Sequence, residues 1–337
     1  MLNLNKVSYA INDNENEVHL IKDASISIPP SKFMAIVGPS GCGKTTLLKI
    51  IAGINEESSG TITWNGRDLS EDDLSASEVG YVPQFSIAFD ELTIHESVSY
   101  ALRLRVGKKH IESQTDAVAT IIEQVGLKEL SDRKVKVLSG GQKRRLSLAL
   151  ELVTNPTLLL CDEVTSGLDP RSEKEIVGLL HSLSQNTERI VVNVTHSLNH
   201  LDLYDIILVL YEGRVVYQGP PDKITHYFSV ESAEEIYPLL GCREPQEWDN
   251  SWNKHKHSYI LEDQEPNAEG AHSVINTTPS ATSQFSALIS RRFKIFARDK
   301  TQLILQAAMI IGFPLLVVVF GLDGISQPKT LPTENTG

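Results

Sequence analysis

The sequence has 337 residues, which is enough for one large domain with a sizeable core or for one domain with appendages. Lys and Arg number 31 against 43 Asp and Glu, and the resulting net charge of −12 argues against a general nucleic-acid-binding protein. The three cysteines are far apart and odd in number, so neither a disulfide framework nor a zinc site is expected. The N-terminus lacks the basic and then apolar run of a signal peptide, and we expect this region to stay in the cytoplasm.

An antiparallel sheet is predicted at the start of the chain. Apolar and polar residues alternate over 2–9 and 18–28, and Asn12-Asp13-Asn14 favours a turn between these two strands. A further strand over 61–64 precedes Asn65-Gly66, a strong turn signal. These segments therefore predict a β subdomain that precedes and surrounds the first buried strand.

Three short apolar runs predict buried parallel strands, and each of them ends at a polar residue able to do chemistry. They are Phe33–Val37, Leu158–Cys161 and Ile190–Val194. Helical stretches dominate from Thr93 to Val153, including one over 111–126, which predicts an inserted helical lobe. A hairpin over 206–217 is expected to close the compact domain.

The C-terminal part changes character twice. Residues 262–283 have few large apolar side chains, which is typical of a flexible linker, and apolar and basic faces at helical spacing then predict an amphipathic helix. This helix is expected at the lipid headgroups, with a soluble helix packed on the domain as the alternative. Residues 303–322 carry no charge and favour a transmembrane helix over a buried core helix. Five basic residues against Asp299 alone precede it, which indicates a cytoplasmic side.

A phosphate-binding loop is predicted between the strand over 33–37 and a helix that begins near Thr46. Its residues are Gly38, Pro39, Ser40, Gly41, Cys42, Gly43, Lys44 and Thr45. The glycines let backbone N–H groups converge on phosphate oxygens, and the helix presents its positive end. Lys44 would neutralise the β- and γ-phosphates, and the Thr45 hydroxyl would ligate Mg²⁺. A glycine turn that binds nothing is the alternative, but the strand and helix on either side favour the phosphate loop.

Two carboxylates follow the buried strand over 158–161. Asp162 is expected to hold Mg²⁺, whereas Glu163 would orient or deprotonate the attacking water, because phosphoryl transfer is mainly a problem of positioning and electrostatics. A strand end with solvated acids is the alternative. The phosphate loop elsewhere in the chain favours the catalytic interpretation.

The segment Ser139-Gly140-Gly141-Gln142 fits a capping box, with Ser139 at the helix N-cap and Gln142 at the third helical position. The same helix start points free N–H groups outward, and two glycines leave it bare enough for a γ-phosphate to approach. Since stability alone does not require the glycines, both roles are predicted.

Taken together, these motifs resemble the nucleotide-binding domains of ABC transporters, over about residues 1–230. The resemblance rests on the order of six motifs, which are Gly38 to Thr45, Gln84, Leu138 to Gln142, Asp162-Glu163, Ser166 to Asp169, and His196. It implies an α/β fold of the P-loop NTPase class with an antiparallel β subdomain and a helical subdomain. It also implies ATP and Mg²⁺ as cofactors and ATP hydrolysis in head-to-tail dimers.

The resemblance assigns further roles. Tyr9 would stack on adenine, and Thr46 would join the loop in contacting the nucleotide. Gln84 would link Mg²⁺ and the attacking water to the helical lobe, and His196 would contact the γ-phosphate. An ordinary strand aromatic, a polar loop residue and a structural histidine are the respective alternatives for Tyr9, Gln84 and His196.

Other implied roles concern the dimer. Ser139, Gly141 and Gln142 would contact the ATP held by the opposite protomer, and Asp169 would communicate across the interface. Val164 departs from the family pattern, in which many members have proline after the Asp-Glu pair. Because this change alters loop stiffness more than chemistry, hydrolysis is expected to survive it.

The order of the segments resembles the G subfamily of ABC half-transporters and related bacterial exporters. The predicted layout is an ATP-binding domain over 1–230, a linker over 231–283, an amphipathic connecting helix over 284–300, a transmembrane helix over 301–322 and an extracytoplasmic tail over 323–337. Because those relatives continue through about six spans, a second polypeptide or a longer chain is expected to supply the remaining membrane segments.

The predicted function is that of the ATP-hydrolysing component of an exporter at the cell membrane. We expect it to work as a homodimer or with another ABC half, and to contact membrane lipid. The expected substrate is lipophilic, and the sequence does not identify it. Two alternatives stay open. One is a soluble-type ABC ATPase with a non-transport role, against which the apolar run and the charge of −12 speak. The other is a membrane adaptor that only binds ATP, against which Glu163 and His196 speak.

Overall fold

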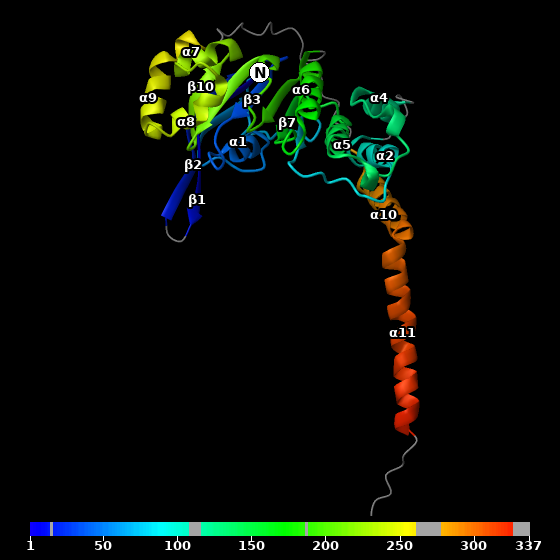
Figure 1. The fold of residues 1–337 in the computed structure, drawn as a ribbon. Helices are drawn as coiled ribbons and strands as arrows, with labels where there is room; N and C mark the ends of the chain where they lie inside the picture. The colour runs from blue at the N-terminus through cyan, green and yellow to red at the C-terminus, as the bar shows by residue number, and fades with distance from the viewer. Residues whose placement is uncertain (14–15, 108–115, 186–187, 261–277, 326–337) are drawn as a thin grey trace, which may run out of the picture. The chain divides into compact units, whose positions relative to one another are not determined.

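The structure is a computed structural model that describes residues 1–13, 16–107, 116–185, 188–260 and 278–325. The chain divides into two compact units, Met1–Gln284 and Phe285–Gly337 (Figure 1). The first unit is an α/β domain with two sheets, as the motifs predict.

The smaller sheet has four antiparallel strands in the order β2-β1-β4-β5. These strands are β2 (Asn16–Ile28), β1 (Leu2–Asp13), β4 (Ser59–Trp64) and β5 (Arg67–Asp68). Apolar residues at every second position of the first strand, such as Leu2 and Leu4, are buried, because alternate side chains of a strand point to the same face. The predicted antiparallel β subdomain is therefore confirmed.

The larger sheet has six strands in the order β10-β9-β3-β8-β7-β6. These strands are β10 (Arg214–Gly219), β9 (Ile206–Tyr211), β3 (Phe33–Val37), β8 (Ile190–Val194), β7 (Leu158–Asp162) and β6 (Val79–Val82). All neighbours run parallel except β9 and β10. The three predicted apolar strands lie side by side and are buried along their whole length, so the polar residues that follow them meet at one edge.

Some helices are the direct neighbours of strands of this sheet in the chain, and others form a separate helical lobe. Helix α1 (Lys44–Ile51) follows β3, and α6 (Pro170–Gln185) precedes β8. The predicted helical lobe is present as α2 (Ile94–Arg105), α4 (Ala117–Gln124) and α5 (Gly140–Leu152). Arg105 on α2 donates two hydrogen bonds to the buried carboxylate of Glu151 on α5, at 2.6 and 2.9 Å, and so ties the lobe together. The first residues of the helix predicted over 111–126 lie outside the described residues.

A C-terminal layer of three helices belongs to the same unit. It consists of α7 (Ile224–Phe228), α8 (Ile236–Leu240) and α9 (Pro245–His255). Trp248 and Trp252 are buried one helical turn apart, and their rings meet a cluster of tyrosines and Phe228. The prediction that the domain ends at 230 and a linker begins at 231 is thus wrong up to residue 260, because these sparse apolar residues pair at i and i+4 and pack on the core. The rest of the predicted linker lies largely outside the described residues.

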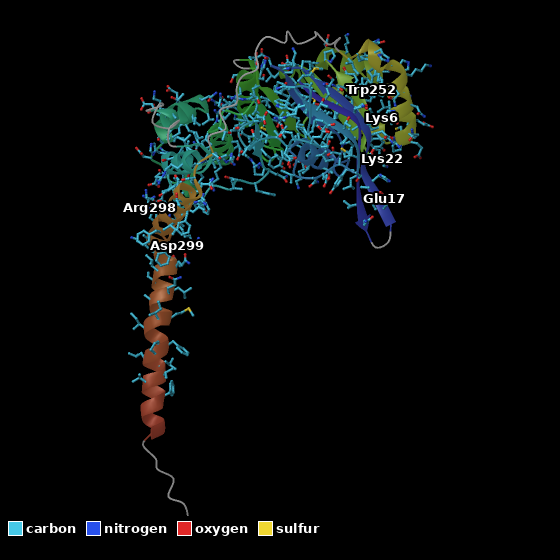
Figure 2. All side chains as sticks on the ribbon, turned by 180° about the vertical axis from the view of Figure 1, so that it is seen from behind. Lys6, Glu17, Lys22, Trp252, Arg298 and Asp299 are labelled. Atoms are coloured by element: carbon cyan, nitrogen blue, oxygen red, sulfur yellow. The ribbon has the colours of Figure 1, made fainter. Side chains whose placement is uncertain are left out.

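Two long helices close the chain. The amphipathic helix is α10 (Ala281–Arg298), and the apolar run forms α11 (Lys300–Ile325). Figure 2 labels Arg298 and Asp299 at the junction, where the Asp299 carboxylate accepts a hydrogen bond from the Gln302 N–H at 3.0 Å and so caps α11. Residues 300–321 have a mean hydropathy of 2.6, and α11 is long and apolar enough to cross a membrane.

Candidate functional site

The phosphate loop connects β3 to α1, and two of its glycines, Gly38 and Gly43, are required by close approach of the backbone. A Cβ on Gly38 would lie 2.1 Å from the carbonyl oxygen of Leu210 on the neighbouring strand. Gly43, the N-cap of α1, has φ 106°, and a Cβ there would lie 2.8 Å from the carbonyl oxygen of Leu20. Side chains would therefore displace the loop from the strands that hold it.

Lys44 lies beneath this loop with only 4% of its surface exposed. Its Nζ donates hydrogen bonds to the carbonyl oxygens of Gly38 at 2.9 Å and Pro39 at 2.8 Å. Burial lowers the pKa of the Lys44 ammonium, and the partially compensating charges include Glu163 and Asp162. The hydrogen bonds that position the cation come from neutral carbonyl acceptors, so the ammonium stays available to an anion such as a phosphate.

The next residue connects the loop to the end of β7. The Thr45 hydroxyl donates to Asp162 Oδ1 at 2.9 Å. The other carboxylate oxygen of Asp162 accepts a hydrogen bond from the Tyr81 hydroxyl at 3.1 Å. Burial raises the pKa of Tyr81, and Asp162 raises it further, so this hydroxyl keeps its proton at neutral pH. Two elements distant in sequence therefore fix the orientation of one carboxylate.

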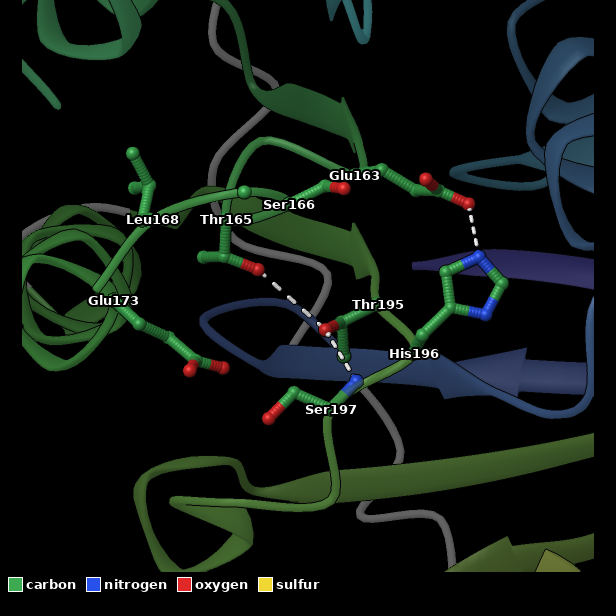
Figure 3. A pocket seen from close by; sticks show the side chains of 9 residues that line it. Glu163, Thr165, Ser166, Leu168, Glu173, Thr195, His196 and Ser197 are labelled. Carbon is green, nitrogen blue, oxygen red and sulfur yellow. Dashed lines mark hydrogen bonds and ion pairs between the residues drawn. The ribbon is translucent and has the colours of Figure 1, made fainter. Parts of the chain in front are cut away.

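Glu163 brings three predicted residues together. Its Oε1 lies 2.5 Å from His196 Nε2 (Figure 3). Its Oε2 accepts a hydrogen bond from Gln84 Nε2 at 2.8 Å. The backbone of Glu163 has φ 49°, in the left-handed region, and its N–H donates to the Val194 carbonyl at 3.1 Å. A non-glycine residue held in this conformation is a feature that recurs at functional sites.

A pocket of about 230 Å³ opens beside this carboxylate. It lies between the loop after β7 and the loop after β8, which supply Glu163 and His196 as well as Thr165 and Thr195 (Figure 3). The two threonine hydroxyls are 3.5 Å apart and connect the loops. The pocket therefore adjoins the groups predicted to act on the γ-phosphate.

The helix start at Ser139 is a capping box, as predicted. Ser139 Oγ accepts from the Gln142 N–H at 3.3 Å, and the Gln142 side chain accepts from the Ser139 N–H at 3.0 Å. A Cβ on Gly140 or Gly141 would meet its nearest neighbours only at 3.6 and 3.8 Å, which is ordinary contact. The fold itself therefore tolerates larger residues at both positions.

Two further predicted residues have structural partners. The Asp169 carboxylate accepts a hydrogen bond from the Ser172 N–H at 3.1 Å in the first turn of α6, and the bonds to Ser172 lower its pKa. Tyr9 is opposite Ile21 in the register of β1 and β2, and Ile21 borders the space where a Gly43 side chain would stand. Tyr9 therefore lies one strand away from a residue that packs on the phosphate loop.

Three side chains that the sequence did not single out contact the predicted site. They are Tyr81, Arg144 and Tyr237. Arg144 on α5 donates to the Gln84 carbonyl, and the Tyr237 hydroxyl joins the backbones of Gly38 and His196. The dipeptide Tyr81-Val82 before Pro83-Gln84 offered a positional hint for Tyr81, whereas Arg144 and Tyr237 carry no local signal.

The donors near Lys44 fit a magnesium ion held together with a nucleotide. Thr45 and Asp162 supply hard oxygen ligands side by side, as Mg²⁺ prefers. Within the described part of the chain, no group of three acidic, histidine or cysteine side chains converges as a complete metal site. Phosphate oxygens of a bound nucleotide would have to complete the coordination.

Comparisons with known proteins agree with this geometry. The family model described as ABC transporter matches residues 21–166. The ABC transporter ATP-binding/permease protein Rv1747 of Mycobacterium tuberculosis is 36% identical over 225 residues, which are 66% of this chain and 26% of that protein. ABC transporter G family member 4 of Arabidopsis thaliana is 30% identical over 337 residues, which cover 93% of this chain and 56% of that protein.

Matches also extend to an import protein and to a solved structure. The sulfate/thiosulfate import ATP-binding protein CysA of Pectobacterium atrosepticum is 32% identical, over 68% of this chain and 70% of that protein. A dimeric structure of MJ0796, described as a bacterial ABC transporter cassette, has a TM-score of 0.58 and 27% identity and covers 66% of this chain and 99% of the cassette. The chain spans about a quarter of the mycobacterial relative and a little over half of the Arabidopsis one. It belongs to the ATP-binding proteins of the ABC transporter family.

Proposed function

We propose that the chain is the ATPase component of an ABC exporter related to the G subfamily, and that it couples hydrolysis of MgATP in a dimer to movement of membrane helices. The observation that carries the proposal is the Glu163 carboxylate, which binds both Gln84 and His196 next to a complete phosphate loop. A protein that only binds ATP would not need a carboxylate held in this way at the reacting end of the nucleotide.

In this proposal the phosphate loop binds the nucleotide, and Lys44 neutralises charge on its terminal phosphates. Glu163 orients the attacking water and accepts its proton, since phosphoryl transfer depends on positioning a nucleophile in line with the leaving group. His196 has 38% of its side chain exposed, so it can contact a γ-phosphate while its Nε2 holds Glu163.

Mg²⁺ would be held by Thr45 and Asp162, with Gln84 nearby, and it would neutralise charge on the phosphate oxygens. Tyr81 keeps the Asp162 carboxylate oriented toward Thr45. Tyr9 is a candidate for stacking on the adenine, because it lies one strand from the packing partner of the phosphate loop.

The second half of the site is proposed to come from another protomer. The N-terminus of α5 exposes Ser139, and Gly140 and Gly141 are not required there by backbone angle or by space. Bare glycines at a helix start suit an approaching phosphate, which supports contact between Ser139, Gly141 and Gln142 and the ATP of the partner. The cassette MJ0796 is dimeric in the structure that resembles this chain, which supports the same arrangement. Asp169 would lie near that interface.

Coupling to a membrane is proposed from the last two helices. Helix α10 has basic residues toward its end, and α11 is apolar over its exposed length. Positive residues before an apolar span favour a cytoplasmic ATPase domain. The similarity to the G family member runs over 93% of this chain, whereas the CysA similarity runs over 68%, and this difference supports an exporter over an importer. A lipophilic substrate suits that class, and additional membrane segments would complete the pathway.

The experiment is to measure ATP hydrolysis by the purified chain in detergent as a function of protein concentration. A rate per molecule that rises with concentration supports a composite site in a dimer. Glu163→Gln, measured alongside, should lower the rate by about 10²- to 10⁴-fold, the usual contribution of a general base. A Glu163→Gln variant that hydrolyses ATP at the parent rate would refute the role of Glu163. Glu173→Gln is the matched control, because Glu173 is a carboxylate that lines the same pocket.

A further inference from the structure

Tyr237 lies on α8, in the C-terminal layer, yet its hydroxyl reaches two loops of the nucleotide site. The oxygen accepts a hydrogen bond from the Gly38 N–H at 3.2 Å and donates one to the His196 carbonyl at 3.2 Å. A phenol has one proton to donate and lone pairs to accept, so both bonds can form at once. Burial raises the pKa of Tyr237, and the hydroxyl therefore keeps its proton at neutral pH.

The two hydrogen bonds of Tyr237 form a bridge at the end of the paired strands β3 and β8. Strands β3 and β8 pair as far as Ile36 and Val194, and the Thr195 N–H then donates to the Ile36 carbonyl at 3.1 Å. Gly38 follows the last residue of β3, and His196 follows Thr195 after β8, at the point where the two strands turn into loops. The Tyr237 hydroxyl thus connects the loops just where direct pairing of the two strands ends.

The bridge continues into the catalytic groups. The His196 carbonyl is bonded to Tyr237, while its ring contacts Glu163, which in turn accepts from Gln84. A series of hydrogen bonds therefore runs from the first glycine of the phosphate loop to the predicted general base. Displacement of the His196 backbone would move the ring away from Glu163, from a γ-phosphate, or from both.

We propose that Tyr237 is a positioning residue that holds the His196 loop at the correct distance from the phosphate loop, and that it acts on the step that senses the γ-phosphate. The inference rests on the proposed function, in which His196 contacts that phosphate. It adds a residue from a segment that lies beyond the matched region 21–166 of the family model.

The test is Tyr237→Phe in the full chain, since this change removes one hydroxyl and keeps the ring. We expect kcat for ATP hydrolysis to fall by about 3- to 10-fold, which corresponds to loss of one or two hydrogen bonds. Tyr217→Phe on β10 is the matched control, because its hydroxyl also donates to a backbone carbonyl, that of Pro220, and its ring contacts the C-terminal layer at Phe228. This control should lower thermal stability and leave kcat unchanged.

A second measurement does not depend on turnover. Affinities for MgADP and for the Mg²⁺ complex of the non-hydrolysable analogue AMP-PNP are compared in the parent and in Tyr237→Phe. The analogue should bind about 3- to 10-fold more weakly to the variant while MgADP affinity is kept, because only the analogue has a γ-phosphate. Equal weakening of both ligands, or no weakening of either, would overturn the proposal.

A double-mutant cycle then asks whether Tyr237 acts through His196. In a His196→Ala background, Tyr237→Phe should produce no further loss of AMP-PNP affinity, because the group that it positions is gone. Full additivity of the two losses would contradict the inference. If parent and Glu163→Gln proved equally active or inactive, the proposed catalytic role would fail, while the affinity ratio would still decide the role of Tyr237.

Discussion

The nucleotide edge, formed by the loops after β3, β7 and β8, differs in kind from the C-terminal layer of α7 to α9. The edge buries a lysine with a lowered pKa and holds Glu163 at a positive φ, and both features cost stability. The layer buries Trp248 and Trp252 against other aromatic rings, including that of Tyr217 on β10, which is stabilising. The two regions teach that the stability cost of a buried charge and a left-handed backbone at the nucleotide edge is offset by apolar packing elsewhere. Tyr237 connects the C-terminal layer to the nucleotide edge, because its hydroxyl bonds to the backbones of Gly38 and His196.

Truncation in the layer should give the largest change in stability. Trp252→Ala removes a ring that is 4% exposed and lies 5.7 Å from the ring centres of Tyr217 and Tyr227. We expect the free energy of unfolding to fall by about 3–5 kcal/mol, as for other buried aromatics, measured by denaturant titration. The kcat of the fraction that stays folded should remain within about 2-fold of the parent. A large loss of kcat in folded protein would show that the layer controls the edge more broadly than through Tyr237.

The opposite pattern is expected for Lys44→Met, which keeps the length of the side chain and removes its charge. MgATP affinity should fall by about 100-fold, or about 2.7 kcal/mol, because the cation no longer meets the phosphates. The free energy of unfolding should stay equal or rise, since a lowered pKa means that the folded state disfavours the charged amine. Lys49→Met on the same helix is the control for binding. A clear loss of unfolding free energy in Lys44→Met would contradict the view that the buried lysine of the nucleotide edge costs stability.

Substitutions of Ser139 can separate its structural role as the N-cap of α5 from its proposed role in contacting the partner's ATP. Ser139→Asp keeps a good N-cap but places a negative charge where the partner's γ-phosphate is proposed to bind. We expect about a 10-fold loss of ATP hydrolysis with a change in unfolding free energy below about 0.5 kcal/mol. Ser139→Ala should instead lose about 1 kcal/mol of stability. If Ser139→Asp and Ser139→Ala both lost activity in proportion to their loss of stability, the capping role of Ser139 alone would account for its effect on hydrolysis.

The smallest effect is expected for Tyr81→Phe. Without the Tyr81 hydroxyl, the Asp162 carboxylate loses one of its two hydrogen bonds from the described residues and keeps the one from Thr45. The Mg²⁺ concentration for half-maximal hydrolysis should therefore rise by about 2- to 5-fold. Since burial raises the pKa of Tyr81 above its ordinary value, the ratio of variant to parent rates should be constant from about pH 6 to 9. A ratio that changed within this range would contradict a protonated Tyr81.

Much of the site could be predicted because its chemistry is local. Glycines with a lysine after an apolar strand, or two acids after another, are recognisable without knowing the fold, and the structure brings Glu163, Gln84 and His196 together. The composition of the C-terminal layer predicts a linker, because its apolar residues Ile236, Leu240, Trp248 and Trp252 are sparse among polar ones. Packing on the core, and not local composition, orders these residues.

The sequence by itself determined the class of chemistry, the buried parallel strands, the capping box at Ser139 and the apolar run of α11, since each depends on residue types within a few positions of one another. Only the tertiary structure decided that Glu163 adopts a left-handed backbone beside His196. It also decided that the Tyr237 hydroxyl connects the His196 loop to the phosphate loop. Gly38 and Tyr237 are 199 positions apart. Contacts at such separation follow from the order of strands and the docking of helices, which no local pattern encodes.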